Sequence, residues 1–104
     1  MNLKEIEMVI IHISAKVKDG TETNFEQSLR EVVENARQTT GCVKYEWYRD
    51  PDSSNHFIIY GEFDSEDNFK AYLKSPVVKR IGEELIPLIE GGPKFKHYKA
   101  SVLE

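Results

Sequence analysis

The sequence predicts an α+β domain in the order βαββαβ, with two helices covering one face of a four-stranded antiparallel sheet. Three observations lead to this prediction. The chain has 104 residues, which suits one domain, and we assign residues 1–104 to it. Apolar segments with alternating faces are interleaved with amphipathic segments of helical period. Two of the alternating segments follow each other directly across a turn, as the strands of a hairpin do.

Residues 5–18 are rich in Val and Ile and predict the first strand, which Gly20 ends. Both of its alternate sets begin apolar, so we expect its first half to be buried on two faces. Residues 23–38 predict the first helix, with Thr23 and Glu26 placed as a capping box. Its apolar stripe repeats at helical spacing and consists of Phe25, Leu29, Val32, Val33 and Ala36.

Residues 42–49 and 56–63 predict the second and third strands. The segment between them, residues 50–55, has the Asp, Pro, Ser and Asn composition of a turn, so the two strands should form an antiparallel hairpin. Asp64 or Ser65 can cap the helix that follows, and the acidic residues beside them suit the positive end of a helix.

Pro76 should break this second helix near Lys74, because proline lacks an N–H and restricts the residue before it. Residues 77–85 predict a further helical piece. The turn formers at 91–93 then lead into the fourth strand, residues 94–103.

Two right-handed crossovers around a hairpin give a ferredoxin-like sheet with both helices on one face. The other face must then carry one alternate set of the third strand: Phe57, Ile59 and Phe63, or Ile58 and Tyr60. Either set leaves a large apolar patch, which monomers avoid. We therefore expect a homodimer in which the two sheets pack against each other.

Composition excludes several function classes. The net charge of −4 and pI of about 5.4 offer a phosphate backbone no basic face, so no nucleic-acid partner is expected. The apolar run at residues 8–13 is too short for a signal peptide or a membrane span, so we expect a cytoplasmic location and no membrane partner. No glycine-rich phosphate loop or nucleophile elbow occurs, and no cofactor is expected.

The cysteine and the histidines do not suggest a metal site. Cys42 is the single cysteine and is expected to be a small buried residue. The three histidines are too far apart for metal-ligand spacing. His12 lies in the middle of an apolar strand, with its sheet face undecided. His56 borders the turn and should be solvated, and His97 should be exposed or at the dimer interface.

The central third of the chain resembles the antibiotic biosynthesis monooxygenase (ABM) domain family, and the resemblance extends over almost the whole length. The residues that carry it are Gly41-Cys42, Tyr45, residues 48–52, Asn55, Phe57, residues 60–63, Ser65-Glu66, Phe69, Ala71, Leu73, Ser75-Pro76, Pro87-Leu88 and Gly91. The resemblance implies a homodimeric α+β barrel. It also implies one cavity per subunit, between the sheet and its helices or at the dimer interface.

The resemblance also limits the chemistry. Where the aromatic polyketide oxygenases of the family carry Asn, Trp and Tyr, this chain has Ile59, Phe63 and Phe69. The positions used by haem-degrading members fall near Ile13, Phe63 and Gly82, none of which can ligate iron, so haem degradation is disfavoured.

Many members read AHLxSPH across the second helix. Here Tyr72 and Val77 replace the two histidines, so an isomerase activity that depends on histidine there is disfavoured as well.

The resemblance implies, as our first expectation, a cofactor-independent monooxygenase acting on a phenolic or quinol-like molecule in an apolar cavity. His12 and Tyr72 are the candidates for proton handling, as catalytic residues. The candidates for substrate binding are Ile59, Phe63, Phe69, Tyr45 and Trp47. The alternative is a dimeric module, non-catalytic or stress-related, that binds a small apolar ligand without turnover.

Overall fold

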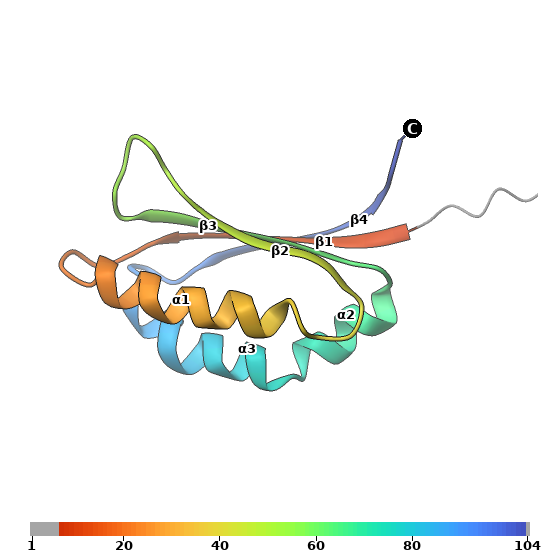
Figure 1. The fold of residues 1–104 in the computed structure, drawn as a ribbon. Helices are drawn as coiled ribbons and strands as arrows, with labels where there is room; N and C mark the ends of the chain where they lie inside the picture. The colour runs from red at the N-terminus through yellow and green to blue at the C-terminus, as the bar shows by residue number, and fades with distance from the viewer. Residues whose placement is uncertain (1–6, 104) are drawn as a thin grey trace, which may run out of the picture.

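A computed structural model describes residues 7–103 of the chain. One antiparallel sheet of four strands, in the order β2-β3-β1-β4, is covered on one face by the helices (Figure 1). The predicted ferredoxin-like α+β fold is confirmed. The strands are β1 (Glu7–Lys16), β2 (Cys42–Arg49), β3 (His56–Phe63) and β4 (Lys94–Ser101).

The helical layer consists of two α-helices of eight residues or more and a chain of shorter pieces. Residues 77–85 were predicted as one helical piece, but the hydrogen bonding changes from α-helical to π-helical at Ile81, and a 3₁₀ turn follows. The helical elements are α1 (Glu22–Ala36), α2 (Glu66–Leu73), α3 (Pro76–Arg80), the π-helical turn η1 (Ile81–Leu85) and the 3₁₀ turn η2 (Ile86–Leu88).

The second and third strands begin and end at the predicted residues. The first strand is shorter than predicted within the described residues, and positions 5 and 6 lie outside them. Its burial also differs from the prediction, because only the set that includes Val9 and Ile11 is buried, and Met8 and Ile10 are half-buried. Cys42 is likewise half-buried rather than buried.

The start of α1 corrects the predicted capping box. Gly20 adopts a φ of 85° and turns the chain early, so the helix begins at Glu22 with Thr21 as its N-cap. Thr23 therefore lies inside the first turn, where it cannot cap. The Thr21 hydroxyl donates to the Lys18 carbonyl at 2.7 Å, and the Gly20 N–H donates to the Glu22 carboxylate at 3.1 Å.

The break between α2 and α3 follows the prediction. Ser65 caps α2 by accepting a hydrogen bond from the Asn68 N–H at 3.1 Å. Pro76 is the first residue of α3, where a missing N–H costs no helical hydrogen bond. The helical layer consequently changes direction at this proline, and α3, η1 and η2 run back along the sheet (Figure 1).

The structure decides which residues of β3 face the helices. Phe57, Ile59 and Phe63 are buried beneath them, and Ile58 and Tyr60 lie on the opposite face. Because residues opposite each other in register share a face, His12, paired with Tyr60, lies on that opposite face too.

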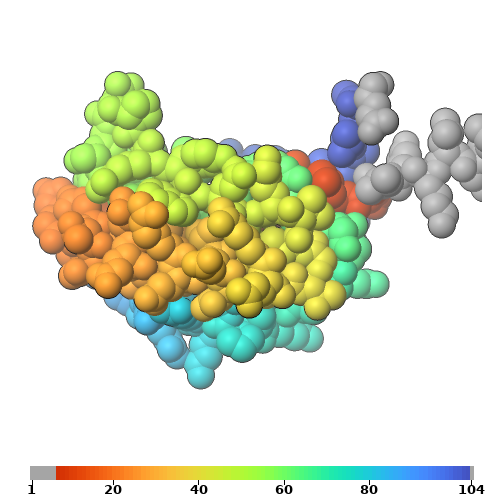
Figure 2. Space-filling model, in the orientation of Figure 1, coloured from red at the N-terminus to blue at the C-terminus, as the bar shows by residue number. Residues whose placement is uncertain are grey.

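This second face, which we call the open face, has no covering element among the described residues (Figure 1). It mixes half-buried or exposed apolar residues with charged ones: Ile10, Ile58, Tyr60 and Tyr98 with Glu46, Glu62 and Lys96. The β2–β3 loop and the C-terminal end of the described chain both rise above it, at opposite ends of the sheet (Figure 2). In residues 7–103, no helix has the length and apolar character needed to cross a membrane.

Candidate functional site

An apolar cavity of about 340 Å³ lies on the helix-covered side of the sheet. Strands β1 and β4 form one wall, and α2, α3, η1 and η2 form the other. Tyr72 and His97 provide the polar groups of the lining. The lining residues are Ile11, Ile13, Tyr72, Leu73, Val78, Ile81, Ile86, Phe95 and His97.

The strand register produces the sheet wall of this cavity. Ile11 is paired with His97 and Ile13 with Phe95, so these four side chains point toward the helices together. Strand β4 is at the edge of the sheet, and Phe95 is 50% exposed. The cavity is therefore bounded by a partly open edge on the β4 side.

Two tyrosines form a buried polar pair at the inner wall of the cavity. The phenolic oxygens of Tyr45, on β2, and Tyr72, on α2, lie 2.7 Å apart, and Tyr45 is only 1% exposed. Burial raises the pKa of Tyr72 to about 12 and raises the pKa of Tyr45 well above its usual range. Both phenols therefore keep their protons at neutral pH, and Tyr72 can donate a hydrogen bond but cannot serve as a base.

His97 stands at the exposed side of the same cavity. Its ring meets the ring of Phe69 nearly edge-on, with 4.9 Å between the centroids. The prediction that His97 is exposed is confirmed, but its place in the cavity wall was missed. The signal was present in the alternation of β4, because His97 shares a face with Phe95. Only the pairing with β1 shows that this face points toward the helices.

The other predicted binding residues lie around the cavity rather than in its lining. Phe63 is fully buried behind Tyr72, with 4.7 Å between ring centroids, and Tyr45 reaches the cavity through its hydrogen bond to Tyr72. Phe69 packs beside Tyr72 and His97. Ile59 is buried in the core.

Trp47 lies in a different part of the structure from the cavity. Its ring centroid is 5.9 Å from that of Phe57, and the Arg30 guanidinium lies 5.0 Å above it. This stack closes the core under α1. Trp47 thus has two packing partners, Phe57 and Arg30, and is not among the cavity-lining residues.

The two residues proposed for proton handling do not meet. Tyr72 lines the apolar cavity, and His12 lies on the open face between Tyr60 and Lys96. His12 faces a separate hollow of about 440 Å³, whose lining includes Tyr98 and Lys94. The sheet itself separates these two sites.

The sequence matches the family model described as antibiotic biosynthesis monooxygenase over residues 8–84. No curated protein sequence matches the chain. The fold is similar to several solved structures at low sequence identity, so these likenesses establish the fold alone.

Three of these structures come from different organisms. A protein from Nitrosomonas europaea, assigned by its name to the same monooxygenase family, superposes with a TM-score of 0.82 at 15% identity, covering 96% of this chain and 95% of its own. One from Deinococcus radiodurans, similarly named, has a TM-score of 0.82 at 24% identity and covers 92% and 95%. A conserved protein from Methanosarcina mazei has a TM-score of 0.83 at 16% identity and covers 89% and 92%.

The matched segment extends from β1 into η1 and thus contains the hairpin, α2 and most of the helical wall of the cavity. It spans well over half of the 104 residues. The chain belongs to the antibiotic biosynthesis monooxygenase family.

Proposed function

We propose that this chain is a cofactor-independent monooxygenase that oxidises a phenolic or quinol-like molecule in the apolar cavity beside Tyr72. The observation that carries the proposal is the composition of the cavity lining, which is apolar except for Tyr72 and His97. A volume of about 340 Å³ is at the lower end of the usual range for small-molecule sites, which suits a compact planar substrate.

The chemistry asks little of the protein beyond positioning and proton transfer. A phenol or quinol, once deprotonated, can pass electrons to oxygen directly. The cavity would hold the substrate beside oxygen, so that the encounter takes place within one site. Among the lining residues, His97 carries the ring nitrogen that can accept the substrate proton.

Tyr72 has the complementary role of orienting the substrate. With the O–H of the deeply buried Tyr45 donating a hydrogen bond to the Tyr72 oxygen, the Tyr45 hydroxyl is satisfied and the Tyr72 O–H is free to donate. That proton can then bond to an oxygen of the substrate in the cavity. The raised pKa of Tyr72 keeps its phenol protonated at neutral pH, because ionisation of this buried group is unfavourable.

The active form proposed is a homodimer formed through the open face. Ile58, Tyr60 and Tyr98 supply apolar area there, and no helix covers it among residues 7–103. The β2–β3 loop and the C-terminal end rise at its two ends and could flank a second copy (Figure 2). A two-fold arrangement would pair the same surface on both subunits.

Oxygen uptake with reduced quinols and aromatic polyketides in air tests the activity, against heat-treated protein. We expect uptake by the native protein that falls by roughly 10²-fold or more in His97→Gln, the loss typical of a missing general base. Tyr72→Phe should also lose uptake, and His12→Gln should keep it if His97 is the base. Glu34→Gln, at an exposed position of α1 away from both the cavity and the open face, is the control. Absence of uptake above background across the panel would contradict the proposal.

A binding module without turnover is the second candidate, and the same lining supports it. Seven of the nine lining residues are aliphatic or Phe, an environment that retains an apolar ligand without activating it. Saturable binding of a quinol, measured by quenching of tyrosine and tryptophan fluorescence, with no oxygen uptake, would favour this candidate over the oxygenase.

A further inference from the structure

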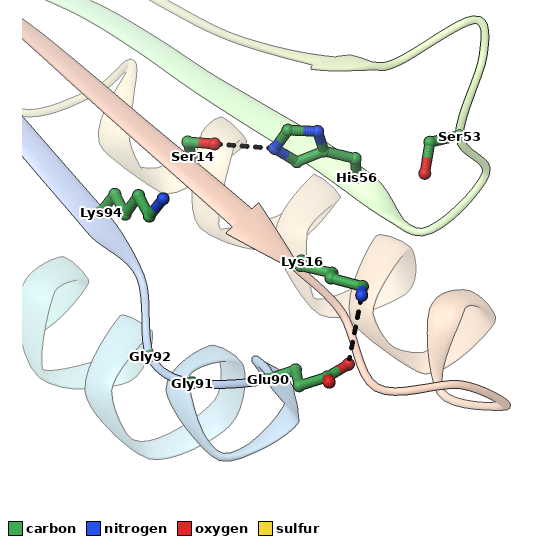
Figure 3. A pocket seen from close by; sticks show the side chains of 8 residues that line it. All are labelled: Ser14, Lys16, Ser53, His56, Glu90, Gly91, Gly92 and Lys94. Carbon is green, nitrogen blue, oxygen red and sulfur yellow. Dashed lines mark hydrogen bonds and ion pairs between the residues drawn. The ribbon is translucent and has the colours of Figure 1, made fainter.

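The two edges of the open face differ in charge. The carboxylates of this face, Glu46 and Glu62, lie on β2 and β3, and the described residues of β1 and β4 place none on it. The β4 edge is basic. Lys94 and Lys96 lie there, and Lys94 is on the same side of the sheet as its register partner Ser14 (Figure 3). The surface assigned to the dimer contact is therefore polarised from one edge of the sheet to the other.

The two lysines of this edge have no anionic partner in their own subunit. Lys16 pairs with Glu90 at 3.9 Å (Figure 3), but Lys94 and Lys96 form no ion pair with any residue in 7–103. Both side chains are exposed in the single chain. A second sheet packed on this face would remove water from both ammonium groups, and a desolvated charge without a counter-charge is costly. A stable dimer should therefore bring carboxylates to β4.

The strand register arranges the side chains of the open face in rows across the sheet. One row crosses all four strands and consists of Glu46, Tyr60, His12 and Lys96. It begins with an anion at the β2 edge and ends with a cation at the β4 edge. If a second copy lies over this row in the reverse direction, Glu46 faces the partner's Lys96. The row is then its own complement.

A face-to-face dimer with two-fold symmetry can have its axis along the strands or across them. An axis along the strands reverses the strand order, so that β2 lies over β4 of the partner subunit. Glu46 then faces the partner's Lys96 at both ends of the row. The second carboxylate, Glu62, needs no cation from the partner, because it accepts the Tyr60 hydroxyl at 2.5 Å within its own subunit.

An axis across the strands gives a poorer fit. It lays every strand over its own copy, so Lys94 and Lys96 of one subunit would lie over β4 of the partner subunit. That strand, residues 94–101, contains no acidic residue. The lysines of both subunits would be gathered and desolvated without a carboxylate from the facing strand. The charge distribution therefore favours the axis along the strands.

We propose that two copies of this chain pack through their open faces with the two-fold axis along the strands, so that Glu46 of each subunit forms an ion pair with Lys96 of the partner subunit. This arrangement rests on the homodimer of the proposed function and specifies which strand covers which. It also brings Tyr60 over the partner's His12, beside the axis.

Carbodiimide coupling of the unmodified protein tests which strands face each other. The reagent activates a carboxylate, a neighbouring amine attacks to form an amide, and the carbodiimide leaves as a urea. Peptide mapping should find Glu46 joined to Lys96. Within one subunit β2 and β4 are three strand spacings apart, about 14 Å, so this amide can form only between subunits. Its absence from a protein that sediments as a dimer would overturn the arrangement, whereas a monomer would overturn the homodimer on which it rests.

Charge reversal, followed by sedimentation equilibrium, tests the ion pair itself. Glu46→Lys and Lys96→Glu should each raise the dimer dissociation constant by roughly tenfold or more, because each places like charges opposite one another at both ends of the row. The double variant restores opposite charges and should return the constant to near the parent value. Glu34→Lys, at an exposed position of α1, is the control for net charge. No recovery in a double variant with the far-UV circular dichroism of the parent would refute the proposal.

Discussion

Tyr45 and Tyr72 join the sheet to the helical layer through a 2.7 Å contact between their phenolic oxygens. Tyr45 belongs to β2 and Tyr72 to α2, and both are buried. Neither hydroxyl can exchange its partner for bulk water without opening the core. The hydrogen bond that stabilises the fold therefore also holds Tyr72, a polar residue of the cavity lining, in position.

Removing one hydroxyl of this pair should destabilise the protein more than removing both. Tyr45→Phe or Tyr72→Phe leaves the other oxygen buried without its partner, at a cost of about 1–3 kcal/mol. In the double variant no polar atom is stranded, so its loss of unfolding free energy should be smaller than the loss in either single variant. Urea denaturation of the four proteins measures this coupling. Additive losses would show that the two hydroxyls do not interact.

Alkaline pH should destabilise the fold through Tyr72. Its folded-state pKa of about 12 lies above the usual value near 10 for an unfolded tyrosine. The stabilising contribution of protonated Tyr72 to the free energy of unfolding is therefore complete below pH 10. It is lost progressively as the pH rises from about 10 to about 12, and amounts to about 2–3 kcal/mol. Unfolding free energies across this range should fall less steeply in Tyr72→Phe. Parallel pH profiles for the two proteins would contradict the prediction.

Gly61 is required by packing. A Cβ there would lie 2.8 Å from Cγ1 of Ile11 and 3.0 Å from Cδ2 of Tyr45. Gly61→Ala should therefore cost about 1–3 kcal/mol, as overpacked cores do. Thermal or urea denaturation measures the loss.

Gly82 is the matched control for this substitution. A Cβ at Gly82 meets no atom within 4 Å, and the residue lies in a helical turn. Gly82→Ala should stabilise the chain by about 0.4–1 kcal/mol, because alanine restricts the unfolded chain. A loss at Gly82 as large as that at Gly61 would refute the packing explanation.

The proposed dimer should depend on Ile58. Ile58→Glu puts a charge on the open face, where a second sheet would have to desolvate it. Sedimentation velocity should show a shift from dimer to monomer, with the far-UV circular dichroism preserved. Gln27→Glu adds the same charge to the exposed side of α1 and should leave the dimer intact. A parent protein that sediments as a monomer at micromolar concentration would rule out this interface.

Filling the apolar cavity should block it without unfolding the chain. Val78 is half-buried in the lining, and Val78→Phe would place a ring in the space a ligand needs. Quinol binding, followed by fluorescence quenching, should weaken by at least tenfold, about 1.4 kcal/mol. Val102→Phe, at an exposed position near the C-terminal end, should bind as the parent does. Unchanged binding in Val78→Phe would place the ligand elsewhere.

Local patterns in the sequence were sufficient for the elements themselves. The alternation of residues 42–49 and 56–63 and the turn between them predicted β2 and β3 to the residue. The cap at Ser65 and the break at Pro76 were equally predictable, because each depends on the chemistry of neighbouring residues. The predicted N-cap of α1, Thr23, was wrong. The turn at Gly20, which has a positive φ, makes Thr21 the N-cap and starts the helix at Glu22.

The sequence by itself therefore determined the α+β order, the hairpin and the family, since periodicity, turn chemistry and family motifs can all be read along the chain. Only the tertiary structure decided which face of β3 is buried, that His97 and Tyr72 share a cavity, and that His56 meets Ser14 from 42 positions away. These contacts follow from strand register and from the side on which the helices pack. Both depend on the simultaneous burial of distant segments, which no local pattern encodes.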